Sequence, residues 1–130
     1  MKYLILVVFM LTSLIACEEK HDDKIQLKGT WIETGSKTDT LIFNEQVDEG
    51  QFTLNREREI RNGYILPKSG SGIYDYSIKR DSIILIIGLS SSREAKAYFF
   101  NIDKTNEIIE IGNFYKDSLD SDINLCFQKQ

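Results

Sequence analysis

Histidine and cysteine, which supply many catalytic and metal-binding groups, are almost missing from this chain. Its 130 residues include one histidine, His21, and two cysteines, Cys17 and Cys126. One histidine in a polar N-terminal stretch serves neither a zinc site nor a catalytic triad. No glycine-rich phosphate loop follows a strand and opens a helix. The sequence therefore predicts a protein that is not an enzyme and that carries neither a metal nor another cofactor.

The chain also lacks an apolar run long enough to cross a bilayer as a helix. Its longest apolar stretch extends from Leu4 to Ile15, is interrupted only by Thr12 and Ser13, and follows Lys2. A membrane-spanning helix needs ~20 apolar residues, whereas the apolar part of a signal peptide needs about 7 to 15 after a positive charge. This pattern predicts a signal peptide over residues 1–16.

The end of this stretch, Leu14-Ile15-Ala16-Cys17, resembles the lipobox of bacterial lipoproteins. The resemblance implies cleavage before Cys17 and attachment of acyl chains, palmitate among them, to that residue. Burial of lipid contributes ~0.8 kcal/mol for each CH₂, so several acyl chains would hold the protein at a membrane permanently. The implied location is the cell envelope, with the protein lipid-anchored to the outer membrane on its periplasmic or its surface face.

Residues 17–25 predict a flexible tether that begins with the acylated cysteine. The stretch from Glu18 to Lys24 contains no apolar side chain that could pack on a core. In some Gram-negative lineages a similar acidic stretch after the lipid-bearing cysteine is a signal for export to the cell surface. A solvated spacer explains the same residues equally well.

Basic residues are fewer than acidic ones. Without the signal peptide, which contains Lys2, the chain has 15 Lys and Arg against 20 Asp and Glu, a formal charge of −5. Nucleic acid and anionic membrane surfaces are poor partners for this balance. The 114 residues that remain are enough for one domain with its own core, which we place at residues 26–130.

Helical periodicity is missing from this domain, and alternation with a period of two dominates. Tyr74, Tyr76 and Ile78, for example, alternate with polar residues and share one face of a predicted strand. Asn62-Gly63 is the strongest two-residue signal for a β-hairpin. The predicted strands are 27–33, 39–44, 51–61, 64–66, 73–79, 82–87, 95–102, 107–114 and 123–128.

Many short strands joined by short connections predict an all-β fold. Such a meander removes its exposed edges by closing on itself, so we expect an antiparallel up-and-down β-barrel of about eight to ten strands. Gly29-x-Trp31 resembles the Gly-x-Trp signature of the lipocalins, and the chain as a whole resembles small lipocalin-like bacterial lipoproteins. The resemblance implies that Trp31 opens the first strand and closes the floor of the barrel. Lipocalins usually stack an arginine of the final strand on this tryptophan, and the final strand here has none.

Three tyrosines are candidates for a ligand pocket. Tyr64, Tyr74 and Tyr76 combine apolar area with a hydroxyl and lie in strands predicted to be neighbours. By analogy with the lipocalins, we expect a membrane-tethered protein that binds a small apolar or amphipathic ligand inside the barrel. The alternative is a non-enzymatic envelope accessory or protein-interaction module with a packed interior, because an eight-stranded barrel is just wide enough for either.

The size of the inward residues would separate these two functions. Small residues such as Ala95, Ala97 and Gly112 would leave room for a ligand if they face inward, whereas bulky residues would fill the barrel. The sequence contains both kinds, so it leaves the choice open.

Three further features have a plain structural interpretation beside a functional one. Cys126 has no partner once Cys17 carries lipid, and we interpret it as a packing residue with a free thiol. The oxygen-rich stretch from Asp117 to Asp122 could hold Ca²⁺, but it lacks the glycine and distal glutamate of an EF-hand loop, so a solvated turn is favoured. The charges from Arg56 to Arg61 fit either a partner surface or a hairpin protected against aggregation.

Overall fold

The structure is a computed structural model, and it describes residues 25–116 and 122–130. The predicted signal peptide, Cys17 and the tether as far as Lys24 lie outside the described residues. In the described part of the chain, no helix is long and apolar enough to cross a membrane. The strands are β1 (Gly29–Glu33), β2 (Thr40–Phe43), β3 (Glu49–Asn55), β4 (Arg58–Arg61), β5 (Tyr64–Pro67), β6 (Gly72–Lys79), β7 (Ser82–Ile87), β8 (Lys96–Ile102), β9 (Ile108–Gly112) and β10 (Asn124–Lys129).

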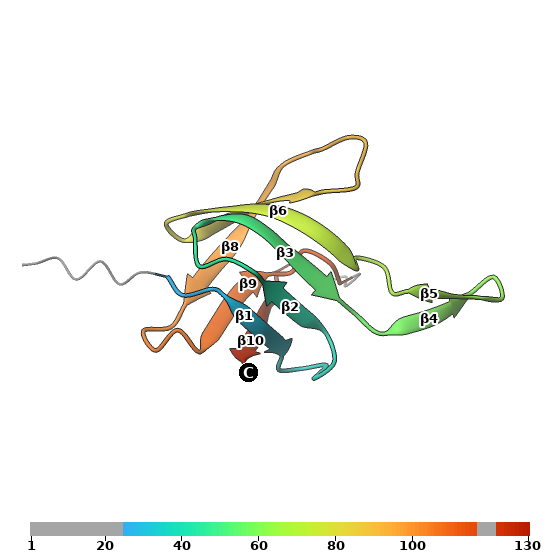
Figure 1. The fold of residues 1–130 in the computed structure, drawn as a ribbon, viewed down its shortest axis with the longest axis horizontal. Coiled ribbons are helices and arrows are strands. Elements are labelled where there is room, and N and C mark those ends of the chain that lie inside the picture. Colours follow the sequence, from blue (N-terminus) through green and yellow to red (C-terminus); the bar gives the residue numbers. More distant parts are fainter. Residues whose placement is uncertain (1–24, 117–121) are drawn as a thin grey trace, which may run out of the picture.

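Eight of these strands form a closed antiparallel barrel. Around the barrel the order is β1-β10-β9-β8-β7-β6-β3-β2, and β1 pairs with both β2 and β10, which closes the sheet. Apart from the closing pair β1–β10, neighbours in the barrel are neighbours in sequence, except where β4 and β5 are inserted between β3 and β6 (Figure 1). This topology confirms the predicted all-β, up-and-down barrel.

The inserted strands form a separate two-stranded sheet that projects from the barrel (Figure 1). The hairpin predicted at Asn62-Gly63 is confirmed, because both residues have positive φ, +54° and +81°, as a type I′ turn requires. The single strand predicted over residues 51–61 is wrong. It is divided into β3 and β4, since Arg56 bonds to Asp39 and to the Ser69 carbonyl, and these contacts take the chain out of the barrel sheet.

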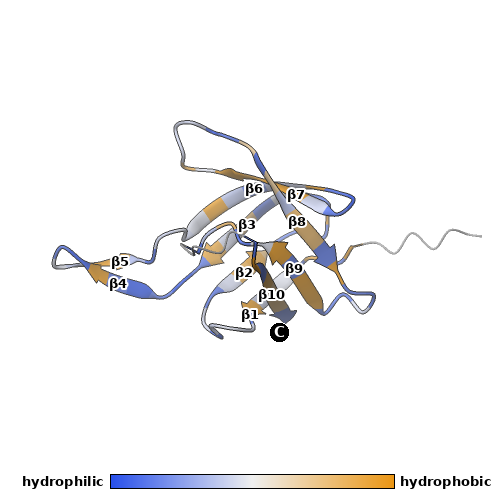
Figure 2. Ribbon diagram, turned by 180° about the vertical axis from the view of Figure 1, so that it is seen from behind, coloured by the Kyte–Doolittle hydropathy of each residue, from blue (hydrophilic) through white to orange (hydrophobic). Residues whose placement is uncertain are grey.

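The barrel interior holds the core, and the period-two alternation explains its composition. In β6, for example, Tyr74, Tyr76 and Ile78 are buried while the residues between them are not. Figure 2 shows the result, with hydrophobic segments in the barrel strands and hydrophilic loops between them. The largest fully buried side chains are Trp31, Phe43, Phe52, Phe127, Leu27, Leu41, Leu54, Ile83, Ile109 and Ile111.

Trp31 lies at the end of the barrel where the chain enters. Its indole Nε1 donates a 2.7 Å hydrogen bond to the carbonyl of Leu27, which satisfies the polar edge of a fully buried ring. The ammonium of Lys129, in the last strand, lies 5.2 Å from the ring centroid and also donates to the carbonyl of Gln26. A cation of the last strand therefore covers Trp31 although no arginine is available.

Gly29 makes this arrangement possible. Its φ of +131° is in a region that L side chains rarely adopt, and a Cβ there would lie 3.2 Å from Cε of Lys129. The glycine and the tryptophan of the predicted motif thus act on the same contact between β1 and β10.

We expect Trp31→Phe to lower the free energy of unfolding by about 1–3 kcal/mol, because the Leu27 carbonyl loses its donor and the smaller ring leaves a gap. Urea denaturation of residues 18–130 measures this loss. Tyr64→Phe is the control, since Tyr64 is 71% exposed and its change should stay within about 0.5 kcal/mol. Equal midpoints for the two variants would contradict the structural role of the indole.

Candidate functional site

The end of the barrel opposite Trp31 carries the longer connections, and we call it the loop end. Residues 34–39 join β1 to β2, residues 56–71 include the β4–β5 hairpin, residues 88–95 join β7 to β8, and residues 113–116 follow β9. Because strands alternate in direction, these connections all lie at the same end of the barrel.

Aromatic rings fill the barrel below the loop end. Phe52 and Tyr74, which are opposite each other in the β3–β6 register, stack with centroids 5.3 Å apart and planes 8° from parallel. Phe114 packs edge-on against both of them, at 5.3 Å from Tyr74 and 6.0 Å from Phe52. Phe43 and Tyr76 extend the cluster towards the other end. The described side chains therefore pack this part of the interior with rings.

The structure brings two of the three candidate tyrosines together. Tyr74 and Tyr76 both face the interior, and their hydroxyls donate to backbone carbonyls, Tyr74 to Gly70 at 2.6 Å and Tyr76 to Val47 at 2.8 Å. Tyr64 does not join them, because it lies in β5, outside the barrel, and β5 pairs only with β4.

Both interior phenols are neutral at physiological pH, and burial makes them weaker acids than an exposed tyrosine. Burial raises the pKa of Tyr76 to about 12, with a further contribution from the negative charges of Glu45 and Asp48. Burial also raises the pKa of Tyr74. Phenols that are neutral and already hydrogen-bonded act as packing groups with a fixed orientation rather than as acids or bases.

A cavity of about 260 Å³ opens at the loop end, on the side of β6, β7 and β8. Its apolar lining consists of Tyr74, Leu85, Ile87, Tyr98 and Phe114. Its polar lining consists of Ser90, Ser92, Glu94 and Lys96, all from the β7–β8 connection or the first residue of β8. The cavity therefore has an apolar wall and a polar rim with both signs of charge.

The residues predicted from the sequence form only part of the lining of this cavity. Tyr74 lines it, but Tyr76 and Tyr64 do not. Phe114 and the serine-rich connection were not predicted, because loop residues follow no period and their direction depends on the closed barrel. Neither Ala95 nor Ala97 provides interior space, since both are exposed, and Gly112 is half-buried with Tyr98 packed close to it.

A second group of polar side chains at the loop end forms the acid–base cluster, which we define as Glu33, Asp39, Arg56, Tyr115 and Lys116. Nε of Arg56 lies 3.2 Å from Oδ2 of Asp39, and its guanidinium lies 4.8 Å from the centroid of Tyr115. Nζ of Lys116 lies 3.2 Å from Oε2 of Glu33. Both carboxylates are almost fully buried, so each needs its cation nearby.

The electrostatics of the cluster favour fixed charges over proton exchange. Burial acts to raise the pKa of Glu33, but hydrogen bonds from Ser36 and the contact with Lys116 outweigh it, and the net pKa is lowered. Burial, together with the charges of Asp39 and Glu33, raises the pKa of Tyr115. A carboxylate that stays ionised, as Glu33 does, can hold the connection between β1 and β2 in place through Ser36 and can bind Lys116 at the same time.

Cys126 lies in β10 between Leu125 and Phe127, which face the core, so its thiol is on the opposite face as strand alternation predicts. The thiol is free and half-buried. Burial raises its pKa, and the nearby carboxylates of Glu110 and Glu33 act in the same direction. A thiol that stays protonated is a poor nucleophile.

No group of three or more His, Cys, Asp and Glu is placed to hold a metal ion within residues 25–116 and 122–130. Most of the Asp117 to Asp122 stretch, the one candidate for Ca²⁺, lies outside these ranges.

No protein-family model matches the chain, and no curated protein or solved structure matches it significantly.

We expect Arg56→Met to lower the free energy of unfolding by about 3–5 kcal/mol, because Asp39 would be left as a buried charge without its cation. Arg61→Met is the matched control, since it breaks the exposed pair with Glu59 and should change stability by less than about 1 kcal/mol. Denaturant titrations of both variants measure the difference. A loss for Arg56→Met no larger than that for Arg61→Met would rule out a structural role for the buried pair.

Proposed function

We propose that this protein is a non-enzymatic, lipid-anchored binding protein of the outer membrane that holds a small amphipathic ligand in the loop-end cavity. The observation that carries the proposal is the cavity itself, in which an apolar wall of Tyr74, Leu85 and Phe114 lies below a rim of polar side chains. Pockets of this composition are typical of small-molecule sites.

We propose that the ligand binds at the mouth of the barrel rather than at its centre, and the packing of the interior supports this position. Phe52, Tyr74 and Phe114 occupy the space that an internal ligand would need. The packed interior agrees with the alternative expected from the sequence, a protein-interaction module. The cavity adds a site that a merely packed module would not need.

Size and polarity define the class of ligand. A volume of about 260 Å³ is slightly below the usual range of ~300–1,000 Å³ for ligand pockets, so the ligand is small, comparable to one ring with a short chain. Its apolar part would contact Tyr98 and Phe114, and its polar group would reach Ser90, Ser92 or the charged pair of Glu94 and Lys96.

The membrane anchor is the second part of the proposal. It is supported by the Leu14-Ile15-Ala16-Cys17 sequence and by the apolar run before it. Lipid on Cys17 would make the membrane the protein's permanent partner. The formal charge of −5 after cleavage argues against nucleic acid as another.

We expect residues 18–130 to bind a short-chain, environment-sensitive fluorescent fatty acid saturably, and Ile87→Trp to weaken binding about tenfold or more, equivalent to ~1.4 kcal/mol. Ile87 lines the cavity and is 52% exposed, so an indole there would fill the mouth without disturbing the core. Ile108→Trp is the control, because Ile108 is 47% exposed but lies in β9, away from the cavity. No saturable signal from the wild type, or the same affinity in both variants, would exclude the cavity as a site.

We expect Cys17→Ser to abolish acylation, since a hydroxyl is not a substrate of the lipoprotein pathway that the signal resembles. Cells that express the wild type or the variant are labelled with a fatty-acid analogue, and incorporation into the full chain is compared. Cys126→Ser is the control and should label like the wild type. Equal labelling of wild type and Cys17→Ser would exclude the anchor.

A further inference from the structure

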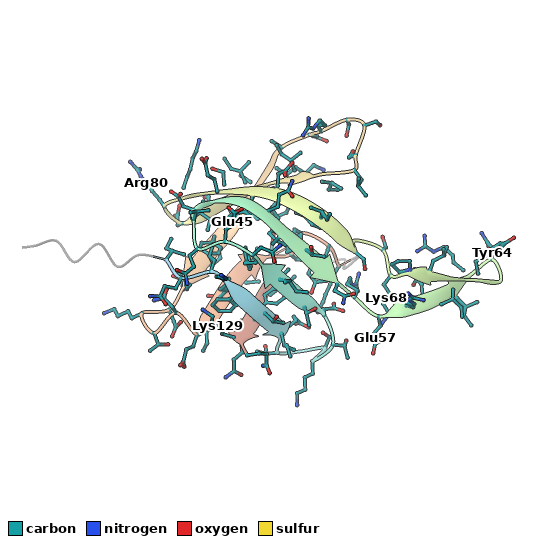
Figure 3. All side chains as sticks on the ribbon, viewed as in Figure 1. Glu45, Glu57, Tyr64, Lys68, Arg80 and Lys129 are labelled. Carbon is teal, nitrogen blue, oxygen red and sulfur yellow. The ribbon has the colours of Figure 1, made fainter. Side chains whose placement is uncertain are left out.

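We propose that the β4–β5 hairpin is a docking element for a protein partner that presents an apolar groove bordered by carboxylates. The hairpin is not part of the barrel, and in the described chain its two strands pair only with each other. Figure 3 shows Tyr64 far out on the hairpin, with Glu57 and Lys68 close to its base.

The hairpin exposes four large apolar side chains, Ile60, Tyr64, Ile65 and Leu66. Ile60 is 78% exposed and Ile65 is 67% exposed, and the register pairs them directly, so they share one face. Tyr64 and Leu66 are exposed on the other face. Two-stranded hairpins are at best marginally stable in water, and exposed apolar area is unfavourable. A partner surface that covers these side chains would therefore account for their exposure in the isolated chain.

The base of the hairpin is fixed, which distinguishes it from a mobile loop. Arg56 precedes β4 and joins the chain to the buried Asp39 and to the Ser69 carbonyl. Lys68 follows β5, and its Nζ lies 2.9 Å from Oε2 of Glu57. The backbone N–H of Lys68 donates a 2.9 Å hydrogen bond to the carbonyl of Glu57. A projecting element held in one orientation loses little entropy when it binds.

The charges of the hairpin indicate the chemistry of its partner. From Glu57 to Lys68 the segment has three cations, Arg58, Arg61 and Lys68, and two anions, Glu57 and Glu59. Its formal charge is therefore +1 on a chain whose formal charge is negative. Arg61 pairs with Glu59 and Lys68 pairs with Glu57, which leaves Arg58, on the isoleucine face, as the cation available to a partner. Complementary potentials guide association, so we infer carboxylates around a groove that encloses the hairpin on both faces, with Ile60 and Ile65 against one wall and Tyr64 against the other.

A membrane is a poorer occupant than a protein. The tip of the hairpin is Arg61-Asn62-Gly63, which is polar, so insertion by the tip would bury an arginine and an asparagine before any isoleucine. The hairpin also projects on the opposite side from the point where the described chain begins at Ile25 (Figure 1). Seven residues separate Ile25 from Cys17, so a lipid on Cys17 would attach the domain to the membrane from the side away from the hairpin. This last argument rests on the proposed lipid at Cys17.

A second copy of the chain is also disfavoured. Two hairpins that met by their isoleucine faces would bring together two segments of the same net positive charge, and Arg58 lies on that face. Like charges at an interface oppose association.

Photocrosslinking in intact cells tests the proposal with the full chain. A photoreactive benzoyl-phenylalanine replaces Tyr64 on the hairpin or, as the control, Leu89, which is 87% exposed in the β7–β8 connection. We expect a discrete protein adduct from position 64 and none of the same mass from position 89. Mass spectrometry of the adduct should locate the crosslink in a partner segment that combines apolar residues with Asp and Glu.

Surface variants then test the chemistry of the contact. In the background with the probe at position 64, Ile60→Ser with Ile65→Ser should lower the yield of the adduct about 30-fold, as loss of a central apolar contact does. Arg58→Glu with Arg61→Glu should also lower it. Leu89→Ser with Ile108→Ser is the matched control and should leave the yield unchanged. The melting temperature should be the same in the hairpin variants as in the wild type, because the hairpin pairs only with itself.

Three results would overturn the proposal: a lipid adduct, an adduct of two copies of this chain, or equal yields from positions 64 and 89. A crosslink to a basic partner segment would overturn the inferred chemistry. The two probe variants keep Ile60 and Ile65 unchanged. The comparison of positions 64 and 89 therefore remains a valid test if a serine variant fails to fold. The experiment also does not depend on the anchor, because acylation of Cys17 is read separately by fatty-acid labelling.

Discussion

Closure of the sheet by β1 and β10 is the constraint on which the rest of the structure depends. Eight strands in a closed barrel leave an interior just wide enough for side chains, so the inward residues must fill it. The contact that closes the barrel is built from Gly29, Trp31 and Lys129, where a glycine lets the last strand approach and a lysine covers the indole. Because the closed barrel is filled with aromatic rings, binding surfaces are left to its mouth and its outside.

At the loop end, a buried ion pair holds the connections between the strands in place. Arg56 follows directly after β3, and its pair with Asp39 ties the connection between β3 and β4 to the connection between β1 and β2. A buried ion pair adds little net stability compared with apolar packing, but it fixes geometry, because each partner is strongly unfavourable without the other. In this barrel the pair lies where the chain leaves the sheet, and so it holds the base from which the β4–β5 hairpin projects.

Much of the fold could be predicted from the sequence, because alternation in a strand reports which side chains share a face. The alternation predicts that Tyr74, Tyr76 and Ile78 share a face, and they do. The turn at Asn62-Gly63 is predictable because asparagine and glycine adopt the positive φ that this turn requires. Alternation does not say which strands belong to the barrel. Tyr64 combines apolar area with a hydroxyl, as pocket residues do, yet its strand pairs outside the barrel, after the break at Arg56. The cavity rim lies in connections, where no period exists to be read.

The cavity and the hairpin meet at one side chain, and this contact indicates how the two proposed surfaces are related. The ring of Tyr74 lines the cavity, while its hydroxyl donates to the carbonyl of Gly70 in the segment that returns from the hairpin. Coupling between two sites requires an element with two arrangements that both ligands bias. Here Gly70 has φ of +88°, and a Cβ there would lie 2.8 Å from Cβ of Tyr115. With Tyr74 stacked on Phe52 as well, the segment has one packed arrangement, so a ligand in the cavity and a partner on the hairpin should bind independently.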